Sequence, residues 1–248
     1  MIPFAKPILD KKEKKLINEV LDSGILVHGN KSLKFEKDFS NFIGGKYSTS
    51  TSSCTSAMHM FYFANNIRAG HEVILPAQTH VATAHAIELT GAKPIFIDSE
   101  LKTGNLDVNL IEKKINKKTK AIVVVHYLGI PVEMKEIIKI AKKYNLFVLE
   151  DCALSLGAYY RNKHTGLIGD GGAFSFYPVK HITTGEGGMF VSKQQKITKK
   201  INLIKAFGIN KNHRERIKSL SYDAIKLGFN YRLGEINSAI GIIQLKKI

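Results

Sequence analysis

The chain has 248 residues, of which 44% are hydrophobic and 23% are charged. This length and balance suit one large α/β domain or two smaller ones, and they exclude a disordered chain. The formal net charge is +16, but the lysines are dispersed over predicted helix faces and turns without a recognition motif, so we expect no nucleic-acid partner and an acidic small-molecule substrate instead.

Two amphipathic helices are predicted at the start of the chain. Apolar residues recur at helical spacing in Asp10–Asp22, and Gly24 is expected to end that helix. The second helix is predicted over Ser32–Ile43, with Ser32 as its N-cap and Gly44 as its terminator. Neither helix carries residues that indicate chemistry.

A hydroxyl-rich run, Ser48–Ser56, leads into a predicted helix over Ala57–Ala69. A hydroxyl-rich turn at a helix start offers backbone N–H groups, side-chain donors and the positive end of the helix dipole, and this combination suits a phosphate. The run is also compatible with a plain N-cap, which is the commoner use of such residues.

Strands and helices then alternate through the middle of the chain. Strands are predicted over Glu72–Pro76, Lys93–Asp98, Thr119–His126 and Leu146–Asp151, and helices over Thr79–Thr90, Asp107–Ile115 and Pro131–Asn145, with Pro131 as a first helical residue. This alternation predicts an α/β fold with a doubly wound, mostly parallel sheet flanked by helices in three layers.

The stretch Gly171–Gly188 contains the most informative lysine. A short apolar segment, Ala173–Tyr177, is ended by Pro178, and Lys180 follows before the turn-rich run Thr183–Gly188. A lysine held on a rigid turn suits Schiff-base chemistry, because the amine must be fixed, desolvated and reached by a carbonyl. A surface-loop lysine between two strands explains this stretch equally well.

Five features fall where parallel strands end or where the chain turns into a helix. They are His80, His126, Asp151, the turn around Thr55 and Lys180. Ligands of open α/β sheets lie beyond the carboxyl ends of the strands, so these groups are predicted to line one crevice. Taken singly, Asp151 could be a helix N-cap and His126 a core histidine with its hydrogen bonds satisfied.

Seven segments also occur in the order and spacing of one known family. They are Ser53–Ala57, Pro76–Thr83, Gly91–Asp98, Glu150–Ala153, Phe174–Lys180, Gly185–Gly188 and Asn230–Arg232. Over nearly its whole length the chain resembles the nucleotide-sugar aminotransferases of the DegT–StrS type, which are pyridoxal 5'-phosphate enzymes of the aspartate-aminotransferase fold (fold type I). The resemblance implies that residues 1–248 form the cofactor-binding large domain with its N-terminal helices.

The resemblance also assigns roles around the cofactor ring. It implies that Lys180 is the catalytic residue and binds the cofactor covalently as an imine. It further implies that Asp151 pairs with the protonated pyridine nitrogen and that His80 stacks on the ring. A carboxylate at that nitrogen keeps the ring cationic, and the cofactor can then act as an electron sink.

Other matched positions imply a phosphate site and a partner subunit. Thr55, Ser56 and Ser175 would hold the cofactor phosphate, and Asn230 would reach the phosphate of a neighbouring subunit. The expected assembly is therefore a homodimer with shared active sites. No metal is expected at the site.

Three departures from the family pattern stand out. Leu154 lies where many members have Gln or His, and Cys54 replaces the usual glycine of the phosphate turn. The sequence stops at Ile248, inside a helix predicted from about Leu233, whereas family members continue with a small carboxyl-terminal domain. We expect that this domain is missing, that nothing covers the apolar face of the last helix (Ile236, Ile240, Ile242, Ile243 and Leu245), and that catalysis is weak.

The preferred function is amination of a keto group on a nucleotide-linked deoxysugar, with glutamate as the expected amino donor. A dehydratase of the same family is the first alternative, but those members carry His at the position of Lys180, and the adjacent His181 does not replace it. A non-catalytic cofactor-binding remnant is the second alternative, and a nucleic-acid binder is the last.

Only two cysteines occur, no basic leader precedes an apolar run, and no long apolar run is found, so we expect a cytoplasmic protein without a signal peptide or membrane span.

Overall fold

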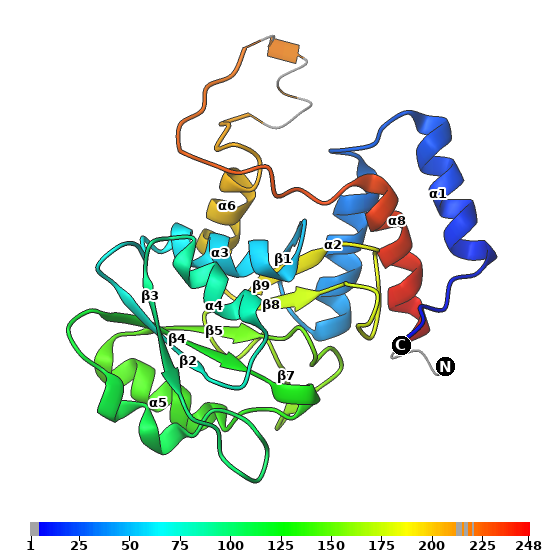
Figure 1. Cartoon of the computed structure of the whole chain (residues 1–248). Coiled ribbons are helices and arrows are strands. Elements are labelled where there is room, and N and C mark those ends of the chain that lie inside the picture. Colours follow the sequence, from blue (N-terminus) through cyan, green and yellow to red (C-terminus); the bar gives the residue numbers. More distant parts are fainter. Residues whose placement is uncertain (1–4, 212–214, 216–217, 220) are drawn as a thin grey trace.

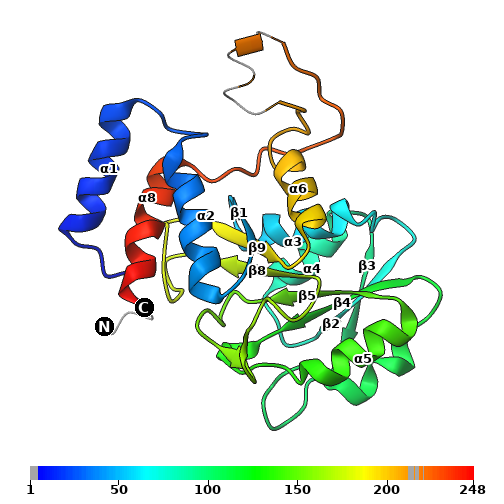
Figure 2. The ribbon, with the colours of Figure 1, turned by 180° about the vertical axis from the view of Figure 1, so that it is seen from behind.

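The computed structural model describes residues 5–211, 215, 218–219 and 221–248 of the chain. Met1, where a signal peptide would begin, lies outside these residues. Within the described part, the chain forms three layers, with a seven-stranded sheet in the middle and helices on both of its faces (Figures 1 and 2). The predicted three-layer α/β architecture is confirmed.

The sheet is mixed but mostly parallel. Its strands are β1 (Tyr47–Thr51), β2 (Glu72–Pro76), β3 (Lys93–Ile97), β4 (Thr119–Val125), β5 (Phe147–Asp151), β8 (Gly171–Ser175) and β9 (Gly188–Ser192). They lie in the order β1-β9-β8-β5-β4-β2-β3, and of these pairs only the two that include β9 are antiparallel. A separate ribbon pairs β6 (Tyr159–Tyr160) with β7 (Lys163–His164).

The predicted α-helices occur in order along the chain, apart from the one expected over Asp107–Ile115, and a further helix at Gln195–Ile204 was not predicted. The observed helices are α1 (Lys11–Ser23), α2 (Asn30–Ile43), α3 (Cys54–Ala64), α4 (Val81–Glu88), α5 (Met134–Tyr144), α6 (Gln195–Ile204) and α8 (Glu235–Gln244). Asp10 caps α1 with its side chain, and Gly24 ends this helix with a φ of 66°, in the left-handed region that glycine tolerates. The predicted stop at Gly24 is therefore confirmed, and the helix begins and ends one residue later than the predicted Asp10–Asp22.

The predicted N-cap of the second helix is wrong. Gly29, and not Ser32, precedes the first turn of α2. The backbone N–H groups of Lys31 and Ser32 donate to the carboxylate of Glu235, at 2.7 and 3.2 Å. A side chain from α8 therefore satisfies the free donors of this helix end, and local sequence does not reveal such a long-range cap.

The hydroxyl-rich run is not one continuous turn. Its first half forms the strand β1, which pairs with β9. The hydroxyl of Ser53 accepts the N–H of Ser56 at 3.0 Å, so α3 begins at Cys54 and not at the predicted Ala57. The helix also ends earlier than predicted, at Ala64.

Two further predictions differ from the structure between β3 and α5. The expected helix over Asp107–Ile115 consists of two single turns of 3₁₀ helix, Val108–Leu110 and Glu112–Lys114. Pro131 does not begin α5, because the next backbone N–H, that of Val132, donates to Nδ1 of His126 at 3.1 Å. That bond holds the segment before α5 as a loop.

The core has three parts that the sheet and the outer helices separate. One lies between the sheet and the helices α3, α4 and α6, and a second lies on the opposite face, under α5. The third joins α2 and α8 to the strands β8 and β9. The strands β4 and β5 contribute to both faces, as expected for the buried strands of a parallel sheet.

The expectation that nothing covers the apolar face of the last helix is wrong for part of that face. In the structure α8 packs against both α1 and α2 (Figure 1). Ile242 and Leu245 are buried, and a Cβ placed on Gly241 would lie 2.6 Å from the ring of Phe35. The amino-terminal helices therefore cover part of this face, while Ile236, Ile240 and Ile243 are half-buried. Among the described helices, none combines the length and apolarity needed to cross a membrane.

Candidate active site

Six chain segments meet at one edge of the sheet. This edge collects the carboxyl ends of β1, β2, β4, β5 and β8, together with the first residue of the reversed strand β9. In the register, Gly188 lies between Thr51 and Ser175, and Asp151 pairs with Ala173. The predicted site residues of β5, β8 and the α3 turn are therefore close neighbours across the sheet.

Asp151 is a buried carboxylate with few donors. Its Oδ2 accepts the hydroxyl of Thr83 at 2.8 Å, its Oδ1 accepts the N–H of Ala153 at 3.0 Å, and the thiol of Cys54 lies 4.0 Å from Oδ1. Burial raises the pKa of Asp151, while the bonds from Ala153 and Thr83 and the charge of Lys180 act in the opposite direction. A cation placed against this carboxylate would stabilise its charged form.

Lys180 lies on a loop that its own backbone closes. The N–H of Phe176 donates to the carbonyl of Gly187 at 2.9 Å, and the N–H of Thr184 donates to the carbonyl of Phe176 at 3.0 Å. The lysine is half-buried, and its ammonium group forms no hydrogen bond or ion pair with another described residue. Its positive charge acts to lower the pKa of Asp151, but burial outweighs this effect and the pKa of Asp151 is raised.

The turn into α3 is an N-capped helix start that lies against β9. The hydroxyl of Ser56 is committed to the cap, since it accepts the N–H of Ser53 at 3.0 Å and donates to the carbonyl of Ser53 at 2.8 Å. The half-buried Thr55 follows Cys54 at the helix start, where the first N–H groups of a helix have no intrahelical acceptor. A Cβ on Gly188 would lie 2.3 Å from the carbonyl carbon of Ser53, so only glycine allows this close approach of β9.

Ser175 and Asn230 lie on either side of this turn. Ser175 ends β8 opposite Gly188, and its hydroxyl is within 3.4 Å of the N–H of Tyr177. Asn230 is exposed, and its backbone pairs with Ala206. The carbonyl of the next residue, Tyr231, accepts the N–H of Ser52 at 2.8 Å, so this late segment runs beside the start of α3.

His80 caps α4 with its side chain. Its Nδ1 accepts the N–H of Ala82 at 3.1 Å, while the ring itself is exposed. The same helix carries Thr83 inward toward Asp151. Helix α4 therefore presents an exposed imidazole and a buried hydroxyl at the same edge.

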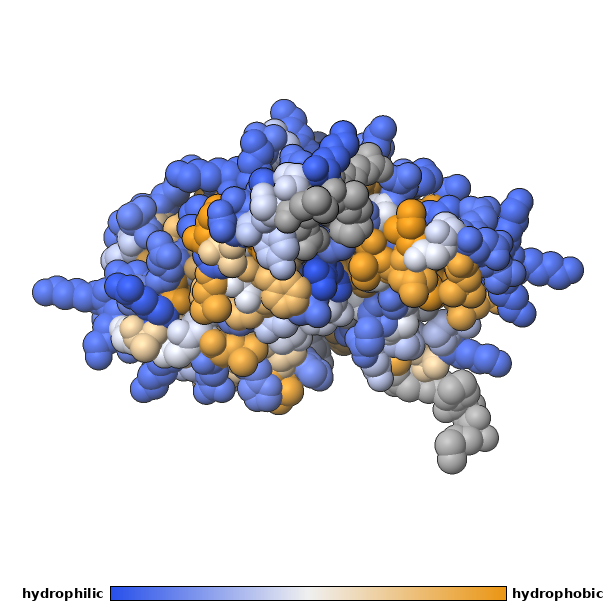
Figure 3. Space-filling model, turned by 90° about the horizontal axis from the view of Figure 1, so that it is seen from above, coloured by the Kyte–Doolittle hydropathy of each residue, from blue (hydrophilic) through white to orange (hydrophobic). Residues whose placement is uncertain are grey.

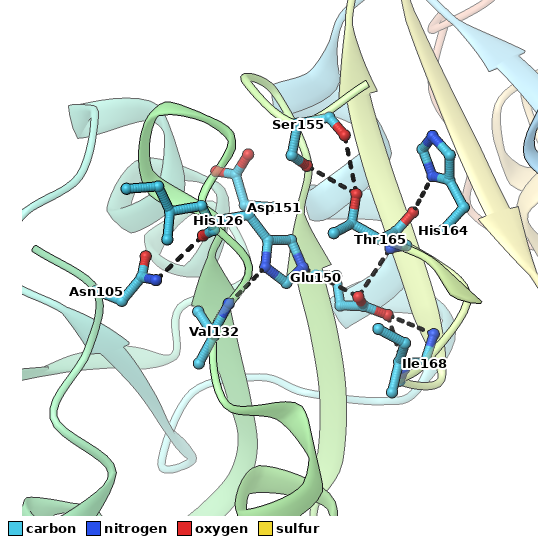
Figure 4. A network of polar contacts seen from close by, with 12 residues as sticks. Asn105, His126, Val132, Glu150, Asp151, Ser155, His164, Thr165 and Ile168 are labelled. Atoms are coloured by element: carbon cyan, nitrogen blue, oxygen red, sulfur yellow. Dashed lines mark hydrogen bonds and ion pairs between the residues drawn. The ribbon is translucent and has the colours of Figure 1, made fainter. Parts of the chain in front are cut away.

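His126 does not line the crevice that was predicted to contain it. The side chain is fully buried, and it forms a hydrogen-bonded pair with Glu150 at 3.0 Å (Figure 4). With Cys152, these residues place three possible metal-ligand atoms within 4.8 Å of one another. The oxygens of Glu150 already accept hydrogen bonds from surrounding N–H groups, so we assign no metal to this cluster.

Sequence reasoning missed two residues of the site. Thr83 donates to Asp151, and Cys54 brings its thiol to the same carboxylate. Helical spacing gave a signal for Thr83, because Thr79 and Thr83 are four residues apart and their hydroxyls lie 2.8 Å from each other. The proximity of Cys54 to Asp151 depends on how α3 packs on β5, which the sequence alone does not show.

The mostly parallel α/β domain that carries this site has the fold of the solved aminotransferase structures that it matches. The chain belongs to the DegT/DnrJ/EryC1/StrS aminotransferase family, whose model matches residues 7–248. The resemblance stated from the sequence motifs is thereby confirmed.

Individual relatives are similar over the whole chain but are longer. The GDP-perosamine synthase of Escherichia coli O157:H7 is 42% identical over 247 residues, which are 99% of this chain and 66% of that protein. The structure of Helicobacter pylori PseC, an aminotransferase involved in the biosynthesis of pseudoaminic acid, has a TM-score of 0.91 and 36% identity over 99% of this chain and 65% of that one.

The PLP-form structure of a putative sugar aminotransferase, Spr1654 from Streptococcus pneumoniae, has a TM-score of 0.91 and 26% identity. It is matched over 99% of this chain and 66% of that one. The chain thus spans about two thirds of the length of these relatives.

Proposed function

We propose that the chain is the cofactor-binding large domain of a pyridoxal-phosphate-dependent aminotransferase that converts a keto group of a nucleotide-linked sugar into an amine. The observation that carries this proposal is the meeting, at one edge of the sheet, of the buried Asp151 at the end of β5 and the loop of Lys180 that follows β8, since Asp151 pairs with Ala173 in the register. Family membership and the names of the relatives support the reaction class.

The residues present fit pyridoxal phosphate. Asp151 is buried and has room in its hydrogen bonding for one more donor, which suits a protonated pyridine nitrogen. The start of α3, packed against Gly188, offers the helix end and close backbone approach that a phosphate requires. Thr55 and Ser175 lie next to this helix start. The hydroxyl of Ser56 already forms the helix cap, so Ser56 would contribute to phosphate binding through its position in the first turn and not through its hydroxyl.

When bound, the cofactor supplies a cationic ring that takes up the electron pair released at the substrate carbon. Asp151 would hold the proton on the ring nitrogen through its buried carboxylate. Lys180 would hold the cofactor carbonyl carbon through Nζ and, once freed by an incoming amine, its Nζ would carry the proton between the substrate carbon that bears nitrogen and the cofactor carbon. The exposed ring of His80 would lie against the cofactor face and fix its tilt.

We assign a nucleotide-linked keto-sugar as the amino acceptor and glutamate as the donor. The relatives named for GDP-perosamine and pseudoaminic acid support a sugar substrate. The net charge of +16 favours an anionic substrate such as a nucleoside diphosphate derivative. The names of the relatives and the net charge both concern the class of the amino acceptor. Glutamate as the amino donor is assigned from the family resemblance.

The proposed assembly is a homodimer in the cytoplasm, with Asn230 of one subunit directed to the cofactor phosphate of the other. Exposed apolar side chains support an interface. About half of the surface is exposed for Ile25, Leu26 and Val27, which connect α1 to α2, and for Leu33 on α2. The surface seen from above carries apolar patches among hydrophilic side chains (Figure 3). Burial of such side chains against a second subunit would be favourable.

The test uses the purified chain, pyridoxal phosphate, glutamate and a panel of nucleotide-linked keto-sugars. Amino-sugar formation, followed by mass spectrometry, is expected with the native chain and not with Lys180→Ala. A matched control is Lys143→Ala, an exposed lysine on α5 that pairs with Glu112 at 3.0 Å away from the site. If pyridoxal phosphate binds but neither half-reaction occurs with any donor or acceptor, the aminotransferase assignment is wrong for this chain.

A further inference from the structure

Glu150 precedes Asp151 on β5 but points to the opposite face of the sheet, as neighbouring strand residues do. Its side chain is completely buried, with an exposed fraction of 0%. Around it, three backbone N–H groups of one loop converge on the two carboxylate oxygens, at 2.8 Å from Gly166, 2.8 Å from Ile168 and 2.7 Å from Gly169. A buried carboxylate is thus the centre of a loop that follows β7.

His126 supplies the fourth donor, and its protonation follows from its other contact. The N–H of Val132 can only donate, so Nδ1 of His126 must accept that bond. The ring proton therefore lies on Nε2 and is donated to Glu150 at 3.0 Å (Figure 4). Every partner of Glu150 is a donor. Burial raises the pKa of Glu150, but the bonds from His126, Gly169 and Gly166 outweigh burial and hold the pKa below its usual value.

The loop around Glu150 also lies directly on the strands of the site. A Cβ on Gly172 would be 2.4 Å from Cα of Gly166, and a Cβ on Gly169 would be 2.7 Å from the carbonyl of Val148. Glu150 and Gly172 are register partners in the β5–β8 pair. The carboxylate thus ties together the end of β5 and the beginning of β8, with only glycines at the closest approaches.

Both strands lead straight into the candidate active site. The residue after Glu150 is Asp151, and β8 continues from Gly172 to Ser175 and then to the loop of Lys180. A shift of β8 along β5 would therefore move the lysine and the phosphate-side serine relative to the carboxylate.

We propose that Glu150 is a positioning residue of the active site, whose carboxylate fixes Asp151 relative to Ser175 and Lys180 through the loop Thr165–Asp170. His126 assists by orienting this carboxylate from the side of β4. The part that concerns cofactor geometry rests on the proposed function, whereas the tie between β5 and β8 can be measured without cofactor.

The experiment compares the native chain with Glu150→Gln and with Glu136→Gln, an exposed Glu on α5 that pairs with Lys139 at 3.7 Å. The Gln amide would direct N–H groups at backbone donors and would lose at least one of the four bonds. Hydrogen exchange without cofactor should become roughly tenfold faster in residues 165–175 of Glu150→Gln, since a buried group left without its hydrogen bond destabilises the loop. The control should match the native chain.

Pyridoxal phosphate is then added to each variant. For Glu150→Gln we expect about tenfold weaker cofactor binding and a shifted visible absorbance band, because the lysine and the carboxylate no longer face the ring as in the native chain. A variant that is less stable to heat but keeps the native band and affinity would overturn the positioning role. Unchanged hydrogen exchange in residues 165–175 would show that the carboxylate of Glu150 does not hold β5 and β8 together.

A second pair of variants keeps the test decisive if Glu150→Gln does not fold. His126→Leu removes one donor of four and should give a smaller change in the same direction, while His126→Gln retains an N–H donor and should restore part of the native absorbance band. Equal behaviour of these two variants would contradict the proposal. If the native chain binds no pyridoxal phosphate, the proposed function fails, but the exchange measurement still reports on the tie between the strands.

Discussion

Glu235 and Lys31 are joined by a 2.7 Å hydrogen bond from the backbone N–H of the lysine to the carboxylate of the glutamate. The same carboxylate would be 2.4 Å from a Cβ on Gly29, so it fills the space that glycine leaves open. One side chain near the end of the described chain thereby completes the first turn of α2. This contact joins the amino-terminal helices to the segment that carries Asn230.

Replacement of Glu235 by Gln is expected to lower the free energy of unfolding by about 1–2 kcal/mol. The variant loses the negative charge at the amino end of α2 and one of its two acceptors there. Urea denaturation followed by circular dichroism measures the loss. Glu19→Gln is the matched control, because Glu19 bonds the ammonium group of the same Lys31 at an exposed site and should change stability little. Equal losses of unfolding free energy in the two variants would show that capping of α2 by Glu235 stabilises the chain no more than an exposed ion pair does.

Reduction with borohydride in the presence of pyridoxal phosphate should attach the cofactor to Lys180 alone. This lysine is half-buried beside Asp151 on a loop that backbone bonds close. Peptide mapping identifies the labelled residue, and Lys180→Ala should give no stoichiometric label. Stoichiometric labelling of any other lysine would contradict the assignment.

Asp151→Asn should reduce transamination by at least about a hundredfold, because a neutral amide cannot balance the charge on the ring nitrogen, and each 1.36 kcal/mol of lost stabilisation costs a factor of ten. Steady-state assays with glutamate and the keto-sugar substrate measure this effect. Near-native turnover would show that Asp151 has a structural role only.

The same substitution should stabilise the cofactor-free chain at neutral pH. Burial raises the pKa of Asp151 above 3.8 in the folded chain, so the folded state holds this proton more tightly than the unfolded state. The contribution of Asp151 to stability is therefore greatest below pH 3.8 and is lost as the pH rises through the folded pKa. Thermal melts of the native chain and of Asp151→Asn from pH 4 to 7 should show a growing advantage for the variant, and a constant difference would contradict this pH dependence.

Hybrid dimers test whether active sites are shared. Lys180→Ala and Asn230→Ala should each be inactive alone, and mixing them should restore up to about a quarter of native activity, since half of the dimers would be hybrids with one intact site out of two. Subunit exchange is verified with differently labelled chains. Absence of recovery despite exchange would indicate that each site is built within one chain.

The central strands were predictable because they are continuous apolar runs buried on both faces, as Thr119–Val125 and Phe147–Asp151 show. The strand β1 was missed because its polar residues are buried. Thr49 donates to Asn202 at 2.5 Å, and the N–H of Ser50 donates to Glu36 at 2.8 Å. Partners on α2 and α6 satisfy these groups, and no local pattern records them.

The candidate site was predictable to a similar extent. The position of Asp151 at a strand end and of Lys180 on a turn followed from the chain itself. The burial of His126 was foreseen only as an alternative to a place in the crevice, and the structure confirms that alternative. The sequence does not identify its partner, because nothing in it distinguishes the role of Glu150 from that of Asp151. Strand alternation separates the two acids, and only the packed loop Thr165–Asp170 shows which of them is committed to backbone donors.

The reversal of β9 has a consequence for the order in which the site can assemble during folding. Because β8 and β9 pair directly, the loop of Lys180 can close as a hairpin from residues 171–192 with a short search along the chain. The carboxylate of Asp151 obtains its partners only when α3 and α4, formed by residues far earlier in the chain, dock on β5. The loop of Lys180 therefore forms through contacts that are local in the sequence, whereas Asp151 depends on contacts with distant segments. Displacement of α4 would remove the hydrogen bond to Asp151 while the β8–β9 hairpin stays closed.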